Sequence, residues 1–457
     1  MAYNFLACDR DQAFLLPPDL RDWLPADHLA WFVRDVVDQV DLGPFLRAYR
    51  ADGHGHPAYD PKTLLGVLLY AYAIGVRSSR QIQRRCVEDL AFRVLAGNQL
   101  PDHVTIARFR ARHEQALAGF LVASLELCAG AGIVRLGVVA LDGTKVAGNA
   151  ADKANRTLAK LDEEVAEILR QAADADEAED RKHGPAQGDE LPAELASPGS
   201  RLARLRQAKA RLEAEAAERQ RRYQQRVAEH AAAARARGKP PSVPLKPRPR
   251  DEAPNPNAAA NTTDPHSRFL RTRNGTVQGY NAQAVVTEQQ IIVAAELTQD
   301  ANDVQQLHPM LRAVGQTLAT AGIAERPATV LADSGYWSIA NLTTIPDAPE
   351  LLVWPAKTGR TGKPRQDGQP SASKSDGLRA AMFAKLRSEP GKACYAKRKQ
   401  TVEPVFGQLK EQQDARRFTR RGLRACEAEW KLLCGTHNLL KLWRHTRRRP
   451  APAATAA

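Results

Sequence analysis

The sequence of 457 residues lacks a hydrophobic run long enough to cross a membrane. Its longest apolar stretch, residues 64–76, covers 13 residues, whereas a transmembrane helix needs roughly 18 to 20. The first residues, MAYNFLACDRDQAF, place acidic and basic side chains where a signal peptide would be apolar. We therefore expect a cytoplasmic protein with no membrane partner.

Cysteine pairs and biased composition are also absent. No C-x-x-C pair occurs, so a zinc site is not predicted, and reduced, mostly buried thiols are expected. With 43% hydrophobic residues and no excess of glycine or proline, the chain is neither fibrous nor wholly disordered, and it can bury a sizeable core. The six cysteines are Cys8, Cys86, Cys128, Cys394, Cys426 and Cys434.

Positive charge, by contrast, is abundant. The chain has 66 Lys and Arg against 52 Asp and Glu, which gives a net charge of +14. Such an excess indicates a polyanionic partner, because each cation placed on a phosphate releases condensed counterions. Charge alone leaves DNA, RNA, a membrane surface and simple solubility open.

Residues 1–130 have the pattern of a helical domain. One buried helix is expected between a cap at Asp60 and Gly75, and a second from about Ser78 to near Gly97. The segment PDHVTIARFRARHEQAL then follows a turn. It predicts a third helix, with Asp102 ahead of it.

The polar face of this third helix is basic. A helix-turn-helix protein would use it to read DNA, because arginine suits guanine edges and phosphates. A solvated basic face explains the same pattern equally well. The DNA-binding candidates on this face are Arg108, Arg110 and Arg112, with His113 beside them.

The region after residue 132 changes to β-rich runs. Helical patterns alternate with the later runs, so we expect an α/β fold with a mixed five-stranded sheet flanked by helices. The second and third runs form a hairpin with a four-residue loop. The runs are 138–141, 279–286, 291–297, one that ends at Asp333 and one that begins at Leu351.

An insertion interrupts this sheet between the first run and the hairpin. Leucines recur at heptad-like spacing in its two halves, at Leu158 and Leu161 and again at Leu202, Leu205 and Leu212. This spacing predicts an antiparallel, coiled-coil-like helical hairpin. Residues 237–256 are rich in proline and basic residues and are expected to form an extended connector.

Three acidic residues lie at the ends of predicted elements: Asp142, Asp333 and Glu403. In a mixed sheet the strands before the two aspartates can be neighbours, and a helix packed across the sheet can bring Glu403 to the same point. Three carboxylates repel one another unless cations bind, and oxygen ligands suit Mg²⁺ or Mn²⁺. Two such ions about 4 Å apart form a clamp for phosphodiester chemistry.

Several ordered motifs together resemble a bacterial insertion-sequence transposase of the DDE type. They are LDGTKV, TDPHSR with QGYNAQAVV after it, LADSGY, the Tyr395-x2-Arg398…Val402-Glu403-Pro404-x-Phe406-Gly407-x2-Lys410 pattern, and RGLRACEAEWKLLCGTHNLLKLW. The resemblance implies an RNase H-like catalytic domain with Asp142, Asp333 and Glu403 as its metal-binding triad. It also implies two Mg²⁺ or Mn²⁺ ions, and that Tyr395, Arg398 and Lys410 hold DNA phosphates.

Spacing around the glutamate tests these implied roles. In an ideal helix Glu403 and Lys410 share a face, whereas Arg398, five residues before Glu403, does not. Lys399 is therefore an alternative to Arg398. Pro404 predicts that the helix begins or bends at this point.

Other charged residues have two interpretations. Lys145 is close enough to Asp142 to contact phosphate but could equally be a solvated strand residue. Asp300 and Asp303 are interpreted as helix-start residues rather than ligands. Basic residues after the glutamate are expected to follow the DNA backbone, although some will only face solvent: Arg416, Arg417, Arg420, Arg421, Arg424 and Arg447 to Arg449.

The hypothesis that follows is a DNA transposase, acting at the nucleoid as a homodimer on terminal inverted repeats and target DNA. An inactive DNA-binding regulator and a metal-dependent nuclease remain alternatives. The expected domains are a DNA-binding domain at 1–130, a catalytic domain at 131–150 and 260–445, an insertion at 151–259, and a disordered tail at 446–457.

Overall fold

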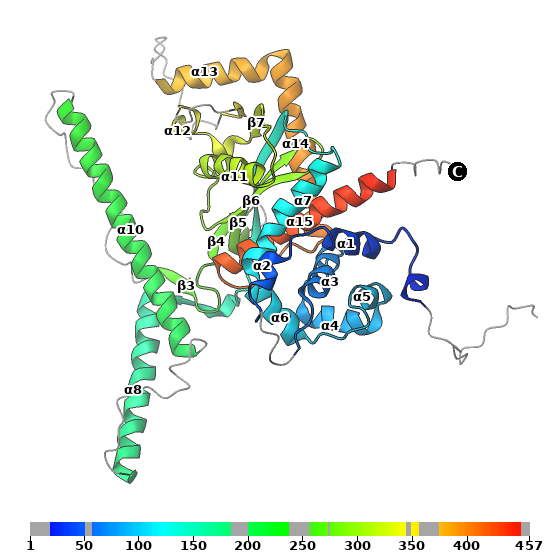
Figure 1. The fold of residues 1–457 in the computed structure, drawn as a ribbon. Helices are drawn as coiled ribbons and strands as arrows, with labels where there is room; N and C mark the ends of the chain where they lie inside the picture. Colours follow the sequence, from blue (N-terminus) through cyan, green and yellow to red (C-terminus); the bar gives the residue numbers. More distant parts are fainter. Residues whose placement is uncertain are drawn as a thin grey trace, which may run out of the picture.

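The computed structural model describes residues 19–50, 57–183, 200–236, 255, 257–272, 275–343, 349–355 and 374–448. A mixed sheet forms its centre (Figure 1), with the N-terminal helices on one side and the two long helices of the insertion projecting on the other. The mixed α/β class and the helical N-terminal region are as predicted. Among the described residues, no helix is both long and apolar enough to cross a membrane.

The N-terminal region is a set of short helices followed by a longer one. Asp60 caps α3 by accepting the Lys62 N–H at 2.8 Å, and Gly75, at φ +80°, ends that helix. The predicted second helix is broken in two, because Asp89 leaves the helical conformation and caps α5 instead. The elements are η1 (Leu20–Trp23), α1 (Leu29–Val37), α2 (Gly43–Leu46), α3 (Pro61–Ala73), α4 (Ser79–Glu88), α5 (Leu90–Leu95), α6 (His103–Arg112) and α7 (Glu114–Gly130).

The central sheet has the strand order β4-β5-β1-β7-β8, with β6 also paired to β5. Gly279 of β5 pairs with Ala147 of β1 on one side and with Arg268 of β4 on the other. Thus β4 and β6 lie end to end along one edge of β5, and six strands replace the five predicted. The strands are β1 (Val138–Ala147), β4 (Arg268–Thr272), β5 (Gly275–Thr287), β6 (Ile292–Thr298), β7 (Thr329–Ala332) and β8 (Glu350–Val353).

The register of the parallel pair β1 and β7 decides where the two aspartates lie. Leu141 of β1 is the partner of Ala332 of β7. Asp142 and Asp333 each follow one of these paired residues. The expected adjacency of the two aspartates is therefore observed.

Helices cover the sheet and complete the core. The helix α15 contacts α7, α3 and β6, and its Trp430 is buried and donates its indole N–H to the Gln283 carbonyl at 3.0 Å. One hydrophobic cluster consequently runs from the N-terminal helices into the sheet. The helices are α11 (Leu307–Thr320), η3 (Ser334–Tyr336), α12 (Ile339–Thr343), α13 (Lys374–Arg387), α14 (Glu389–Glu411) and α15 (Leu423–Arg448).

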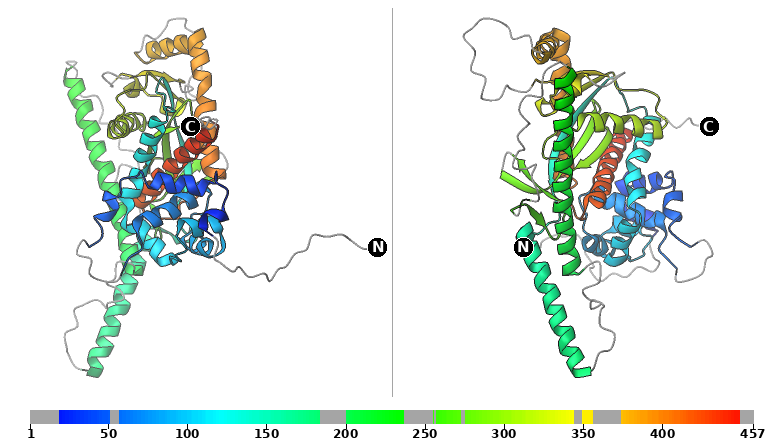
Figure 2. Two further views of the ribbon diagram at one scale, coloured as in Figure 1. Left: turned by 45° about the vertical axis from the view of Figure 1, so that its right-hand side comes forward. Right: turned by 90° about the vertical axis from the view of Figure 1, so that its left-hand side faces the viewer.

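The insertion is helical, as predicted, but its helices pack over only part of their length. Leu158 and Leu161 pack against Leu205 and Leu212 in a small separate cluster. The buried residues of α10 all lie in its first half, and the far ends of the two helices point apart (Figure 2). The elements are η2 (Asp152–Ala154), β2 (Asn155–Thr157), α8 (Leu158–His183), α10 (Arg201–Ala236) and β3 (Ala259–Asn261), with β2 and β3 paired.

Three smaller predictions concern the cysteines, the C-terminal tail and the proline-rich connector. Five cysteines are free thiols, four of them buried and Cys394 half-buried, as expected, while Cys8 lies outside the described residues. The predicted disordered tail from residue 446 is wrong at its start, because α15 continues to Arg448. Most of the proline-rich connector at 237–256 lies outside the described residues.

A buried carboxylate joins the N-terminal helices to the sheet. The Glu429 side chain is 1% exposed and lies 3.2 Å from Arg77 and 3.6 Å from Arg110, whose side chains are 3% and 7% exposed. Glu429 also accepts the backbone N–H groups of Thr419 at 3.0 Å and Arg420 at 3.1 Å. A buried ion cluster is kept only when each charge is paired and hydrogen-bonded.

Glu429→Gln removes the negative charge that two buried guanidinium groups share, and leaves Arg77 with only the exposed Asp414 carboxylate at 3.6 Å. We expect the free energy of unfolding to fall by about 3 to 5 kcal/mol, measured by urea denaturation. Glu411→Gln, which breaks the exposed pair with Arg416, is the control and should cost less than about 1 kcal/mol. Equal losses in the two variants would contradict the assigned role of Glu429.

Candidate active site

Asp142 and Asp333 lie side by side, because each follows the last residue in the pairing of β1 with β7. Asp142 is within β1, its side chain is 20% exposed, and it accepts the Gly143 N–H at 2.8 Å. Asp333 follows β7 and caps the short helix η3 by accepting the Gly335 N–H at 2.8 Å. Asp333 lies in the turn that ends β7, whereas β1 continues past Asp142 to Ala147 and is longer than the predicted run 138–141.

Burial dominates the electrostatics of Asp142. It raises the pKa of this carboxyl from 3.8 to about 6, and the nearby Asp333 carboxylate acts in the same direction. The Arg398 guanidinium opposes both effects. Asp142 therefore lies in an environment that disfavours its charge unless a cation is close.

The helix α14 carries the third acid and runs unbroken through Pro404. Of the two predictions for this point, a helix that begins there or one that bends there, the first is therefore wrong. Proline has no N–H to donate to the carbonyl four residues earlier, that of Gln400. The Gln290 side-chain amide donates to that carbonyl at 3.1 Å instead. The turn between β5 and β6 thus provides the hydrogen bond that Pro404 cannot make.

Arg398 connects the strand and the helix. Its guanidinium lies 3.0 Å from Asp142 and 3.8 Å from Glu403, and the Arg398 side chain is 12% exposed. Glu403 is 55% exposed. Lys399, the alternative raised by the spacing, is exposed and is not the residue that reaches Asp142.

The other two residues of the predicted signature also lie beside the aspartates. The Tyr395 hydroxyl donates to the Ala332 carbonyl at 3.1 Å, next to Asp333. The Lys410 ammonium donates to the Thr144 hydroxyl at 2.5 Å, two residues after Asp142. Burial lowers the pKa of Lys410. The structure therefore brings four residues of α14 close to Asp142 on β1: Tyr395, Arg398, Glu403 and Lys410.

The carboxylates do not form a closed cage. Among the described residues, no group of three or more His, Cys, Asp or Glu side chains is close enough to hold a metal ion. The Arg398 guanidinium nevertheless contacts carboxylates of both β1 and α14. These carboxylates thus converge on one cationic centre, and their oxygen-only chemistry fits Mg²⁺ or Mn²⁺.

One DNA-binding candidate on α6 is placed differently from its prediction. Arg108 and Arg112 are exposed, but Arg110 is 5% exposed. Its guanidinium donates to the Tyr72 hydroxyl at 2.6 Å and lies in the ion cluster of Glu429. The basic face therefore excludes Arg110, which joins α6 to α15 instead.

Most arginines after α14 contact protein groups. Arg417 donates to the Gly148 and Ala150 carbonyls at 3.0 and 2.8 Å, and Arg421 to the Asn149 carbonyl at 3.0 Å. Arg416 pairs with Glu411, Arg420 and Arg424 with Glu114, and Arg447 with Asp27. Arg449 lies outside the described residues. This segment fixes the end of β1, a role that its charge did not indicate.

Asp303 is the residue whose interpretation changes most. It does not cap α11, whose N-cap is Gln306, without a side-chain cap bond. Its carboxylate instead pairs with Lys145 at 3.3 Å and accepts the amides of Asn281 and Gln283. Sequence analysis missed the two amides, although polar residues at alternate positions of an otherwise apolar strand were a signal for them.

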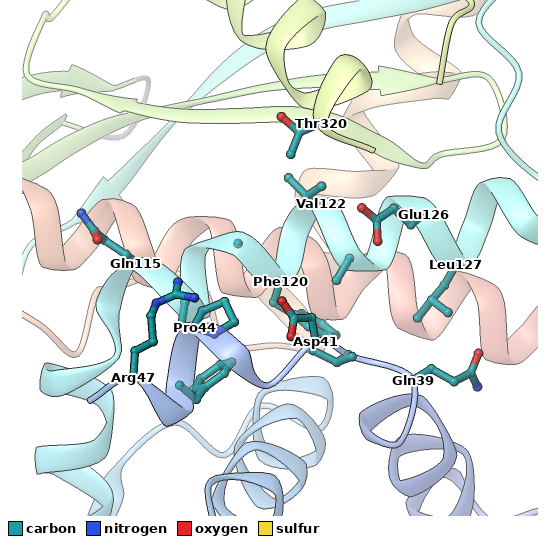
Figure 3. A pocket seen from close by; sticks show the side chains of 15 residues that line it. Gln39, Asp41, Pro44, Arg47, Gln115, Phe120, Val122, Glu126, Leu127 and Thr320 are labelled. Carbon is teal, nitrogen blue, oxygen red and sulfur yellow. The ribbon is translucent and has the colours of Figure 1, made fainter. Parts of the chain in front are cut away.

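A separate cavity lies far from these residues in the fold. Its volume is about 570 Å³, and it lies between α2, α7 and the end of α11 (Figure 3). Its lining is largely apolar, with Phe45, Phe120 and Leu127 among the side chains. The predicted catalytic acids are not part of it.

Comparisons with known proteins place transposase domains at both ends of the chain. The family described as Transposase domain (DUF772) matches residues 18–112, and the family described as Transposase DDE domain matches residues 362–443. The second match includes Glu403 and the signature residues around it but neither aspartate. Neither the curated proteins nor the solved structures gave a match.

The fold and these carboxylates together define a mixed α/β protein. Its acids lie where the pairing of β1 with β7 ends, and a helical region precedes the sheet in the chain. The two matches are both to transposase domains, and they support an insertion-sequence transposase of the DDE type.

Replacing Arg398 tests the electrostatics of the site without DNA. Because burial and Asp333 raise the pKa of Asp142 while Arg398 lowers it, Arg398→Met should move this pKa above about 6. The measurement is a pH titration of ¹³C-labelled aspartate carboxyls by NMR, with Asp142→Asn to assign the signal. Lys410→Met removes a cation that contacts Thr144 rather than a carboxylate and should leave the pKa of Asp142 unchanged. An unmoved pKa in Arg398→Met would contradict this account.

Proposed function

We propose that this DNA transposase binds the terminal inverted repeats of its element, cleaves phosphodiester bonds there with divalent metal, and transfers the 3′-hydroxyl ends to target DNA. The observation that carries the proposal is the convergence of Asp142 and Glu403 on Arg398, with Asp333 beside Asp142. These are the residue types that phosphoryl chemistry with two metal ions requires.

Asp142, Asp333 and Glu403 are the residues that would hold the metal. Mg²⁺ or Mn²⁺ held by these acids would supply activation of the attacking oxygen and stabilisation of the leaving one. The acids come from two strands and one helix, so the chain can hold them at fixed positions only while α14 remains packed on the sheet. The bond from Tyr395 to the Ala332 carbonyl supports this packing beside Asp333.

Arg398 and Lys410 are suited to hold the DNA backbone at this edge. The guanidinium of Arg398 can form paired hydrogen bonds with a phosphate, and Lys410 supplies a point charge. In the protein alone these cations contact Asp142 and Thr144. When DNA binds, each would exchange a protein oxygen for a phosphate oxygen, while the acids remain in place.

A second surface could bind the DNA at a distance from the proposed cleavage site. A cleft of about 790 Å³ lies between α4, α6 and the segment after α14, and its lining includes Arg80, Asn149 and Arg421. Asn149 is seven residues beyond Asp142, and a strand rises about 3.3 Å per residue, so the two positions are roughly 23 Å apart. That distance is about seven base pairs of B-form DNA. One duplex could therefore contact both.

A homodimer is part of the proposal, because two ends of the element must be held together for joining. The insertion helices α8 and α10 project from the molecule (Figure 2), which makes them a candidate contact between subunits. Gel filtration with and without end-containing DNA tests this part of the proposal separately.

The catalytic assignment is tested by single substitutions. Asp142→Asn, Asp333→Asn and Glu403→Gln should each lower Mg²⁺-dependent cleavage of an end-containing duplex by about a thousandfold, since several kcal/mol of charge stabilisation is lost at about 1.4 kcal/mol per tenfold. All three variants should still shift the mobility of that duplex. Glu389→Gln, an exposed position on the helix of Glu403, is the control and should cleave normally.

Two outcomes would overturn parts of the proposal. Cleavage retained by Asp142→Asn or Asp333→Asn would remove the site assignment. Cleavage of end-containing DNA without joining of a pre-cut end to target DNA would instead indicate a nuclease.

The DNA path is tested by the salt dependence of binding. Each phosphate contact adds about 0.9 to the slope of log affinity against log salt. Arg80→Ala combined with Arg108→Ala, at exposed positions on α4 and α6, should therefore lower the slope by about 2 in fluorescence anisotropy. Arg222→Ala, on the insertion and paired with Glu218, is the control, and an equal change there would contradict the proposed path.

A further inference from the structure

One carboxylate beside the catalytic aspartates has no part in the proposed chemistry so far. Asp303 lies between β6 and α11, and its side chain is 24% exposed. A single oxygen, Oδ1, accepts three donors: Asn281 at 2.7 Å, Gln283 at 2.8 Å and Lys145 at 3.3 Å. Such a set of donors fixes the position of the carboxylate.

The donors are themselves held in place within the sheet. Asn281 and Gln283 of β5 are both 0% exposed, and the Gln283 amide also donates to the Asn281 side-chain oxygen at 3.0 Å. The Tyr336 hydroxyl donates to the side-chain oxygen of Gln283, and the Asn281 side chain also donates to the Asp300 backbone carbonyl at 3.1 Å. A buried network with its groups satisfied in this way is rigid.

Asp303 lies close to the residues that follow Asp142 in β1 and Asp333 after β7. A Cβ atom added to Gly143 would lie 2.8 Å from Asp303 Oδ1, and one added to Gly335 would lie 3.5 Å from Asp303 Oδ2. Gly143 and Gly335 therefore both approach the Asp303 carboxylate closely, and a larger side chain at Gly143 would collide with it. The Asp303 carboxylate also contributes to the raised pKa of Asp142, after burial and Asp333.

We propose that Asp303 is a positioning residue of the active site, whose fixed negative charge beside Asp142 and Asp333 strengthens the binding of divalent cations. Lys145 balances this charge in the protein alone. The inference rests on the proposed function, because it assumes that the aspartates bind metal. It assigns Lys145 to the electrostatics of the site rather than to a direct phosphate contact.

The test is isothermal titration of the full chain with Mn²⁺, without DNA, in four variants. Asp303→Asn keeps the acceptor for the two amides and removes the charge, so Mn²⁺ affinity should fall by about tenfold. Lys145→Gln removes the balancing cation, so affinity should rise by about threefold. Asp300→Asn, a carboxylate three residues away that accepts the Gln306 amide, is the matched control and should stay within about twofold of the parent chain. Asp142→Asn reports on the metal site itself.

The opposite responses separate a charge effect from a structural one. Unchanged Mn²⁺ affinity in a folded Asp303→Asn would overturn the inference, as would equal losses in Asp303→Asn and Asp300→Asn. If Asp303→Asn does not fold, Lys145→Gln decides, and affinity that does not rise overturns the inference. If Asp142→Asn is the only variant whose Mn²⁺ binding changes, the inference fails and the proposed function stands. If Asp142→Asn still binds Mn²⁺ and still cleaves DNA, the proposed function itself fails.

Discussion

The burial of Glu429 is the constraint on which the arrangement of this transposase depends. Its counter-ions come from the N-terminal helices, through Arg77 and Arg110, and two of its donors are backbone groups of residues 419 and 420. The segment just before these residues pairs with the end of β1, where the Phe418 N–H donates to the Ala147 carbonyl at 2.8 Å. Glu429 therefore links the strand of Asp142 to the N-terminal helices, in addition to the hydrophobic cluster that they share.

The features that sequence analysis predicted correctly have local or topological causes. The apolar run before Asp142 correctly indicated a buried strand, but β1 continues past Asp142 to Ala147 and the acid is only 20% exposed, so the expected strand end with an exposed acid is wrong. The adjacency of Asp333 follows from the parallel pairing of two such strands. The cap at Asp60 and the end of α3 at Gly75 depend only on residues within one turn of each helix.

The features that it missed depend on contacts between residues far apart in the chain. Arg110 belongs to a regular basic pattern, and only the position of Glu429, 319 residues later in the sequence, shows that it is buried. Ideal helical geometry places Arg398 off the face of Glu403, but a long arginine side chain reaches Asp142 from the flank of α14. Pro404 is tolerated inside that helix because Gln290, from another element, bonds the carbonyl it leaves free.

The electrostatic design of the site also explains its basic surroundings. Asp142, Asp303 and Asp333 lie together in a partly buried place, where like charges are costly. Arg398 and Lys145 each pair with one of these acids, so positive side chains stabilise the fold of the site before they meet any phosphate. The count of 66 Lys and Arg residues therefore overstates the number of cations that are free for DNA.

The short pair β2 and β3 has a consequence for how this chain could change in length. Asn155 lies opposite Asn261, so the chain leaves the catalytic region and returns to it about 5 Å apart. The described part of the insertion between these two residues has its own small core around Leu161 and Leu205, and we call it a cassette. Whole helical turns could be added to the cassette or removed from it, and the register of β1 with β5 and β7 would stay the same.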